Sequence, residues 1–157
     1  MKKSVLIIIL LFISLCNLNA RHKKQAVTNS EILSIYIRHT ACFGRCPDYS
    51  IEIDNNGKIK YTGIHFVKDS GEYEESVSVA LVQGLFDKFT KFRVDTCKAV
   101  YENRVVDLPG IIYKITYKDK TQSISNAHCG PAFLRKLAVN VDSFAHVDDT
   151  WKKLQIK

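Results

Sequence analysis

Two cysteines four residues apart, Cys42 and Cys46, are the residues in this sequence best suited to chemistry. A disulfide between them needs Cα atoms about 4.4 to 6.8 Å apart, whereas four residues of extended chain span about 13 Å. The segment must therefore turn; Gly44 permits a turn, and Pro47 prevents its continuation as a helix. Closing so short a loop stabilises the fold by only about 2 kcal/mol. The spacing therefore favours a disulfide that fixes local shape.

Two other chemistries remain open for the same pair. A thiol–disulfide redox centre would gain thiolate stability from the neighbouring basic residues, although such enzymes usually place Cys-x-x-Cys at the N-terminus of a helix. Here the spacing is one residue longer, and the segment joins two predicted strands. A zinc site would combine Cys42 and Cys46 with His128 and Cys129, but neither half has a diagnostic spacing. We expect no metal site, no cofactor and no catalytic residue.

Residues 1–20 have the pattern of a secretory signal peptide. Two lysines precede an almost entirely apolar run at 5–15, and the segment ends on the small residue Ala20. The run is shorter than the roughly 20 residues of a membrane-spanning helix. We expect an exported protein, periplasmic or extracellular, with no stable membrane span after cleavage. The alternatives are an uncleaved anchor and a lipoprotein processed at Cys16.

Removal of the signal peptide would leave four cysteines, the pair above with Cys97 and Cys129. An even number in an exported chain is typical of disulfides, so we expect all four to be bonded. Four thiols allow three pairings, and the spacing does not choose among them. Cys129 begins a predicted helical segment, where a single reactive thiol is the alternative.

The composition argues against several classes of function. The formal charge of +7 falls to +5 without residues 1–20, and the lysines are spread along the chain with no nucleic-acid-binding motif. We therefore expect no nucleic-acid partner. The chain has no Gly-x-Ser-x-Gly, phosphate-loop or His-Glu-x-x-His motif, which favours a non-enzymatic role.

Apolar patterning predicts a single α+β domain over residues 31–148, between a flexible lead-in at 21–30 and a tail at 149–157. The expected sheet is antiparallel, with about five to six strands. Its clearest hairpin turns at Asn56-Gly57. The expected strands lie near 31–39, 49–54 and 58–66, in a short segment that begins at Gly71 and leads into a helix, and in a second hairpin at 110–126.

Two segments have the periodicity of amphipathic helices, and we expect both to pack on one face of the sheet. The second begins near Pro131, a residue favoured at the first helical position. The apolar residues expected to face the sheet are Val77, Leu81, Leu85 and Phe89 in the first helix, and Leu134, Leu137, Val141 and Phe144 in the second.

The segment around the cysteines reads Arg38-x-x-x-Cys42-Phe43-Gly44-x-Cys46-Pro47-x-Tyr49 and precedes a hairpin with Gly57 and Gly63. It resembles the Arg-x-x-(x)-Cys-Phe-Gly-x-Cys-Pro signature of a bacterial exported domain family of unknown function. The likeness covers roughly residues 31 to 145, including Asp107-Leu108-Pro109. It implies that Cys42 and Cys46 are the shared pair and that a Cys97–Cys129 bond would be a local addition. It transfers no activity.

We therefore expect an envelope-associated or secreted binding or structural module whose ligand the sequence does not identify. The closed loop would present Phe43 and Arg45 as contacts, with Asp107 as a further candidate beside it. The alternative is a thiol–disulfide redox protein or sensor using Cys42 and Cys46. A hydrolase with dispersed catalytic residues is a third hypothesis.

Overall fold

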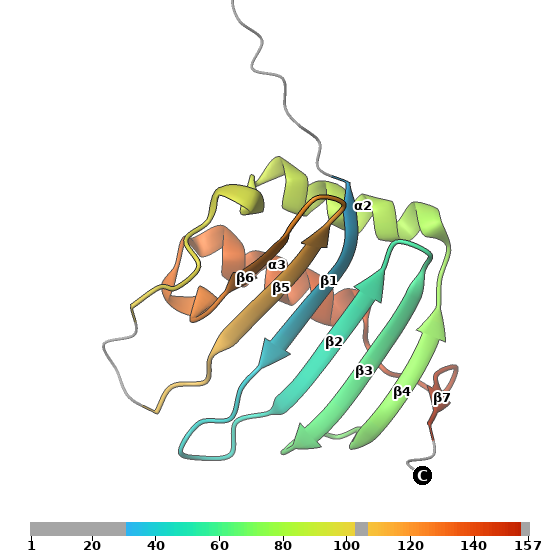
Figure 1. The fold of residues 1–157 in the computed structure, drawn as a ribbon. Coiled ribbons are helices and arrows are strands. Elements are labelled where there is room, and N and C mark those ends of the chain that lie inside the picture. Colours follow the sequence, from blue (N-terminus) through green and yellow to red (C-terminus); the bar gives the residue numbers. More distant parts are fainter. Residues whose placement is uncertain (1–30, 103–106, 155–157) are drawn as a thin grey trace, which may run out of the picture.

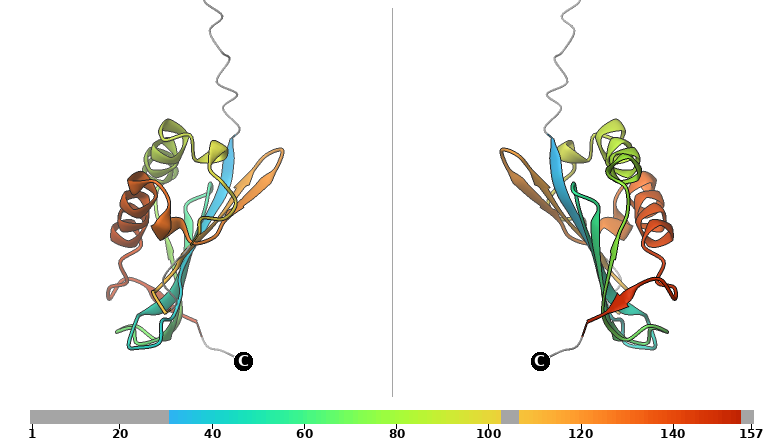
Figure 2. Two further views of the ribbon diagram at one scale, coloured as in Figure 1. Left: turned by 90° about the vertical axis from the view of Figure 1, so that its left-hand side faces the viewer. Right: turned by 90° about the vertical axis from the view of Figure 1, so that its right-hand side faces the viewer.

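One antiparallel sheet of seven strands, covered on one face by two helices, organises the described residues, 31–102 and 107–154 of the computed structural model (Figure 1, Figure 2). The strand order is β6-β5-β1-β2-β3-β4-β7. The strands are β1 (Ile32–His39), β2 (Asp48–Asp54), β3 (Lys58–His65), β4 (Gly71–Ser76), β5 (Ile111–Tyr117), β6 (Thr121–Ile124) and β7 (Lys152–Lys153).

The expected count of five to six strands was wrong, because β7 adds a seventh strand. This strand consists of two exposed lysines in the segment that looked like a tail. It has no apolar alternation of its own and exists only through its pairing with β4, where Lys152 lies opposite Glu74 and Lys153 opposite Tyr73. The ammonium group of Lys153 lies 5.2 Å from the centre of the Tyr73 ring, so cation–π attraction supports the pairing.

The hairpin expected at Asn56-Gly57 is confirmed between β2 and β3, where Ile53 pairs with Ile59. Gly57 has a φ of +97°, a conformation that strongly favours glycine. The carboxylate of Asp54 accepts hydrogen bonds from the backbone N–H groups of Asn56 and Lys58, at 2.9 and 3.0 Å. Local turn chemistry therefore supports the register of this hairpin at the turn.

The two helices are α2 (Val79–Lys91) and α3 (Ala132–Phe144). The buried face of α3 matches the expected one, apart from Phe144, which is only partly buried against the core. The buried face of α2 differs from the expected one at its start. Leu81 is 59% exposed, while Val82 is fully buried. A helix has 3.6 residues per turn, so a strict four-residue repeat drifts by about 40° at each step and leaves the buried face. The buried residues follow mixed three- and four-residue steps: Val82, Leu85, Phe86 and Phe89 in α2, and Leu134, Leu137, Ala138 and Val141 in α3.

Several chain connections meet at one end of the sheet (Figure 1). The β1–β2 connection contains the two cysteines, residues 66–70 join β3 to β4, and β5 begins beside the first of these. Within the described ranges, no helix is long and apolar enough to cross a membrane. The side chains with the most evident chemistry lie at this end of the sheet.

Candidate functional site

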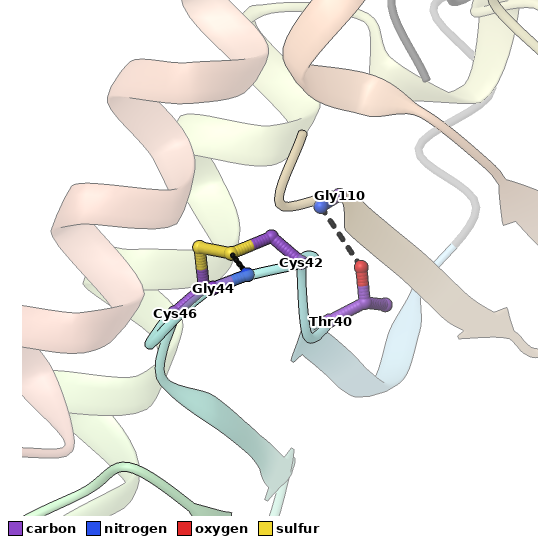
Figure 3. The surroundings of a disulfide bond; sticks show 5 residues. All are labelled: Thr40, Cys42, Gly44, Cys46 and Gly110. Carbon is purple, nitrogen blue, oxygen red and sulfur yellow. Dashed lines mark hydrogen bonds between the residues drawn. A yellow bond between two sulfur atoms is a disulfide. The ribbon is translucent and has the colours of Figure 1, made fainter. Parts of the chain in front are cut away.

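Cys42 and Cys46 form a disulfide that closes the connection between β1 and β2 (Figure 3). Their Cα atoms are 5.5 Å apart, within the usual range for such a bond. Phe43, between them, is 91% exposed. Arg45 is exposed as well, and Pro47 leads into β2. The structure thus places an aromatic ring and a cation on a covalently closed loop.

Two backbone-directed hydrogen bonds fasten the start of this loop to the residue before β5. The N–H of Thr40 donates to the carbonyl oxygen of Gly110 at 3.0 Å, and the N–H of Gly110 donates to Thr40 Oγ1 at 2.8 Å (Figure 3). Asp107 lies three residues earlier, exposed and with a φ of +79°. The hydrogen bonds of the described residues include none from its carboxylate to the loop. The segment therefore supports the loop through its backbone.

Gly44 does not provide the conformational freedom that the sequence suggested. Its φ is not positive, and an added Cβ would contact only the Cys42 sulfur at an ordinary 3.8 Å. Its N–H donates to that sulfur at 3.2 Å, a bond that any residue except proline can make. The disulfide itself, together with the Thr40–Gly110 bonds, holds the turn.

We expect Gly44→Ala to change the free energy of unfolding by less than about 0.5 kcal/mol, because the new methyl group meets no clash and the backbone meets no strain. Urea unfolding of the oxidised protein measures this. A loss above about 1 kcal/mol would contradict the geometry and would mean that the loop needs glycine.

Arg38 and Asp48 flank the loop at the end of β1 and the start of β2 and form a two-point ion pair. Arg38 Nε and Nη2 lie 3.3 Å from Asp48 Oδ1 and Oδ2, respectively. The aspartate side chain is 7% exposed and the arginine side chain 40%. A carboxylate this deeply buried requires a partner, so Arg38 has a structural role at the base of the loop.

His39, Tyr49 and Asp142 form a second cluster, on the helix-covered face of the sheet. The His39 and Tyr49 rings stack with centroids 4.5 Å apart. Asp142 Oδ1, from α3, accepts a hydrogen bond from the Tyr49 hydroxyl at 3.0 Å and lies 3.1 Å from His39 Nε2. Burial, followed by the charge and hydrogen bond of Asp142, raises the pKa of Tyr49 well above its ordinary value. The cluster thus joins α3 to both strands that carry the loop.

Cys97 and Cys129 are free thiols, so the second disulfide expected from the cysteine count is not formed. Cys97 follows the short helix η1 (Val94–Thr96), and Cys129 ends η2 (Ala127–Cys129). Burial raises the pKa of the Cys97 thiol, and a hydrogen bond with Tyr101 opposes this shift. An added Cβ on Gly130 would crowd the Tyr101 ring at 2.9 Å. Tyr101 thus lies beside Cys97 and beside Gly130, the residue that follows Cys129.

The zinc alternative has no counterpart in the structure. The sulfurs of Cys42 and Cys46 are bonded to each other. His128 Nδ1 accepts a hydrogen bond from the Ile111 N–H at 3.3 Å, and burial lowers the pKa of the imidazole. Across residues 31–102 and 107–154, no group of three or more His, Cys, Asp or Glu side chains is arranged to hold a metal ion.

A family model described as a domain of unknown function, DUF6438, matches residues 33–145, which is most of the chain. The chain belongs to this family. A search of curated proteins finds no match. The DUF6438 match runs from β1 to the residue after α3 and contains the disulfide loop and both clusters beside it.

Within the DUF6438 domain, sequence reasoning found the cysteine pair, Arg38 and Tyr49 but missed their partners. One partner had a signal: His39 and Tyr49 are equidistant from Gly44, so a hairpin closed there places them opposite each other, as observed. The sequence contains no comparable signal for Asp142, because this residue is 103 positions from His39 and contacts it only through the packing of α3.

Proposed function

We propose that this protein is an exported binding module that contacts its partner through the Cys42–Cys46 loop. Phe43 is the apolar anchor of the contact, and Arg45 is its charged neighbour. The observation that carries the proposal is the 91% exposure of Phe43 on a loop that is both covalently closed and hydrogen-bonded to Gly110. Aromatic side chains are frequent binding hot spots, and a rigid frame reduces the entropy lost on association.

Export rests on the composition of residues 1–20, which lie outside the described residues, and on the disulfide. Exposed disulfides persist in the periplasm and outside the cell, whereas cytosolic thiol systems reduce them. We also propose that the Arg-x-x-x-Cys-Phe-Gly-x-Cys-Pro segment is the shared signature of the family. The structural roles of the residues in this segment support the proposal. The cysteines close the loop, and Arg38 neutralises buried Asp48.

The experiment replaces Phe43 with a photo-crosslinking phenylalanine analogue in living cells and compares it with the same analogue at Leu81. Leu81 is 59% exposed, but it lies on α2, away from the loop. We expect one discrete adduct from position 43 and none from position 81. We also expect Phe43→Ala to abolish capture of that partner while changing the free energy of unfolding by less than about 0.5 kcal/mol, because the ring makes few intramolecular contacts. Equal adducts from both positions would contradict the proposal.

The redox alternative makes a different prediction about the same bond. Neither cysteine lies at a helix N-terminus, since β1 ends at His39 and β2 begins at Asp48, so the usual source of a lowered thiol pKa is missing from the loop. Titration against a glutathione buffer separates the two functions. A potential below about −300 mV marks a structural bond, whereas one near about −200 mV would favour redox chemistry over binding.

A further inference from the structure

A pocket of about 180 Å³ lies between the helix-covered face of the sheet and the C-terminal end of α3. The sheet supplies two tyrosines and an isoleucine, and the β3–β4 connection supplies one aspartate. The end of α3 and the residues after it supply the rest. The lining residues are Tyr49, Ile51, Tyr61, Asp69, Asp142, Ala145, His146 and Val147. Phe43 is not among them, so this pocket is distinct from the loop surface.

The polar groups of the pocket are mainly acceptors of hydrogen bonds. Asp142 uses Oδ1 for both of its contacts, with His39 and Tyr49. Among the described residues, neither its Oδ2 nor the carboxylate of Asp69 has a hydrogen-bond or ion-pair partner. Two carboxylates therefore line one small pocket of a protein whose formal charge is +7, and among the described residues neither of them pairs with a lysine or an arginine.

The Tyr61 hydroxyl belongs to the same set of acceptors. Tyr61 is 8% exposed, and its ring stacks beside that of Tyr49 with centroids 5.7 Å apart. Burial, then the negative charge of Asp69, and more weakly that of Asp142, raise the pKa of Tyr61 to about 12. Both carboxylates thus lie near this one phenol, and all three side chains line the pocket.

The groups that line the pocket suit an organic cation better than a metal ion. No cluster of three metal-ligating side chains occurs in the described ranges, so a divalent ion would have too few protein ligands. An ammonium group has three donors, which match the carboxylates of Asp69 and Asp142 and the hydroxyl of Tyr61. Ile51, Ala145 and Val147 supply apolar contacts for the carbon chain attached to such a group.

We propose that this pocket binds a primary ammonium group carried on a short apolar chain. Two sources share this chemistry: a small free alkylamine and the side chain of a lysine in a peptide. His146 lines the pocket and is exposed to solvent.

The test is a titration of the purified, isotope-labelled protein with n-butylamine at pH 7.5, followed by amide NMR. n-Butanol is the uncharged control of equal length. We expect shift changes confined to residues around Tyr61, Asp69 and Asp142, and a Kd at least about tenfold lower for the amine, because charge-assisted hydrogen bonds are the stronger ones. Equal responses to the amine and the alcohol, or shifts that map to another surface, would overturn the proposal.

Variants then assign the binding to particular atoms. Asp69→Asn keeps the size of the side chain and removes its charge, and we expect it to raise the Kd for butylamine at least about fivefold. Asp119→Asn removes an equal charge from an exposed turn and should leave the Kd unchanged, as should Phe43→Ala on the loop. The amide spectrum of each variant shows that it is folded. An unchanged Kd in folded Asp69→Asn would overturn the proposal.

The source of the amine is settled by a second titration with Nα-acetyl-lysine amide. Binding tighter than that of butylamine would assign the pocket to a lysine side chain of a peptide. Weaker binding, with butylamine still preferred over butanol, would assign it to a free amine. Because Phe43→Ala is a control here and the decisive variant for the loop, failure of either proposal leaves the other intact.

Discussion

Replacing Arg38 with alanine is expected to lower the free energy of unfolding by about 2 kcal/mol. The substitution leaves Asp48, whose side chain is 7% exposed, without the guanidinium that contacts both of its oxygens. Removing one partner of a fully buried pair costs about 3 to 5 kcal/mol; because the Arg38 side chain is 40% exposed, water partly replaces it and reduces the loss. Urea unfolding at neutral pH measures the change.

A matched control is Lys60→Ala, which also removes a cation from a strand of this sheet. Lys60 pairs with Glu72 at 3.1 Å, but the two side chains are 38% and 36% exposed, so the loss should stay below about 1 kcal/mol. Equal losses for the two variants would show that burial of Asp48 does not decide the effect.

The parts of the fold that could be predicted are those that local chemistry specifies. The β2–β3 hairpin follows from Asn56-Gly57 and from the carboxylate of Asp54, which lies within the same turn. Strand β7 could not be predicted, because Lys152 and Lys153 have no strand propensity without β4 beside them. The number of strands therefore depended on a contact between distant segments.

The candidate site divides in the same way. The disulfide and the cross-strand pair of His39 and Tyr49 lie on one hairpin, so spacing alone is enough to bring them together. The carboxylates of the pocket come from Asp69, in a connection between strands, and from Asp142, on the last helix. Whether these two carboxylates come close depends on how α3 packs across the sheet. The spacing of apolar residues indicates only approximately which face of α3 meets the sheet, so it does not place Asp142.

Gly63 is the position where a single methyl group should have the largest effect on both the fold and the pocket. It lies on β3 opposite Tyr49, and an added Cβ would overlap the backbone oxygen of Asp69 and lie 2.9 Å from a methyl carbon of Val67. A backbone atom cannot rotate away as a side chain can, so the 66–70 connection must shift. We expect Gly63→Ala to cost about 3 kcal/mol, the upper end of the range for overpacking, as measured by urea unfolding.

Gly84→Ala makes the same chemical change where the structure leaves open space, in the middle of α2, with no atom within 4 Å of the new methyl group. Alanine is the better helix former, so this variant should be more stable than wild type by about 0.5 to 1 kcal/mol, opposite in sign to Gly63→Ala. The two variants separate steric crowding from a general intolerance of alanine for glycine. Because the shift at Gly63 moves Asp69, butylamine binding should weaken in Gly63→Ala and stay unchanged in Gly84→Ala. If Gly63→Ala were as stable as wild type, the connection between β3 and β4 would be able to move at little energetic cost. The position of Asp69 at the pocket would then not be fixed by the structure.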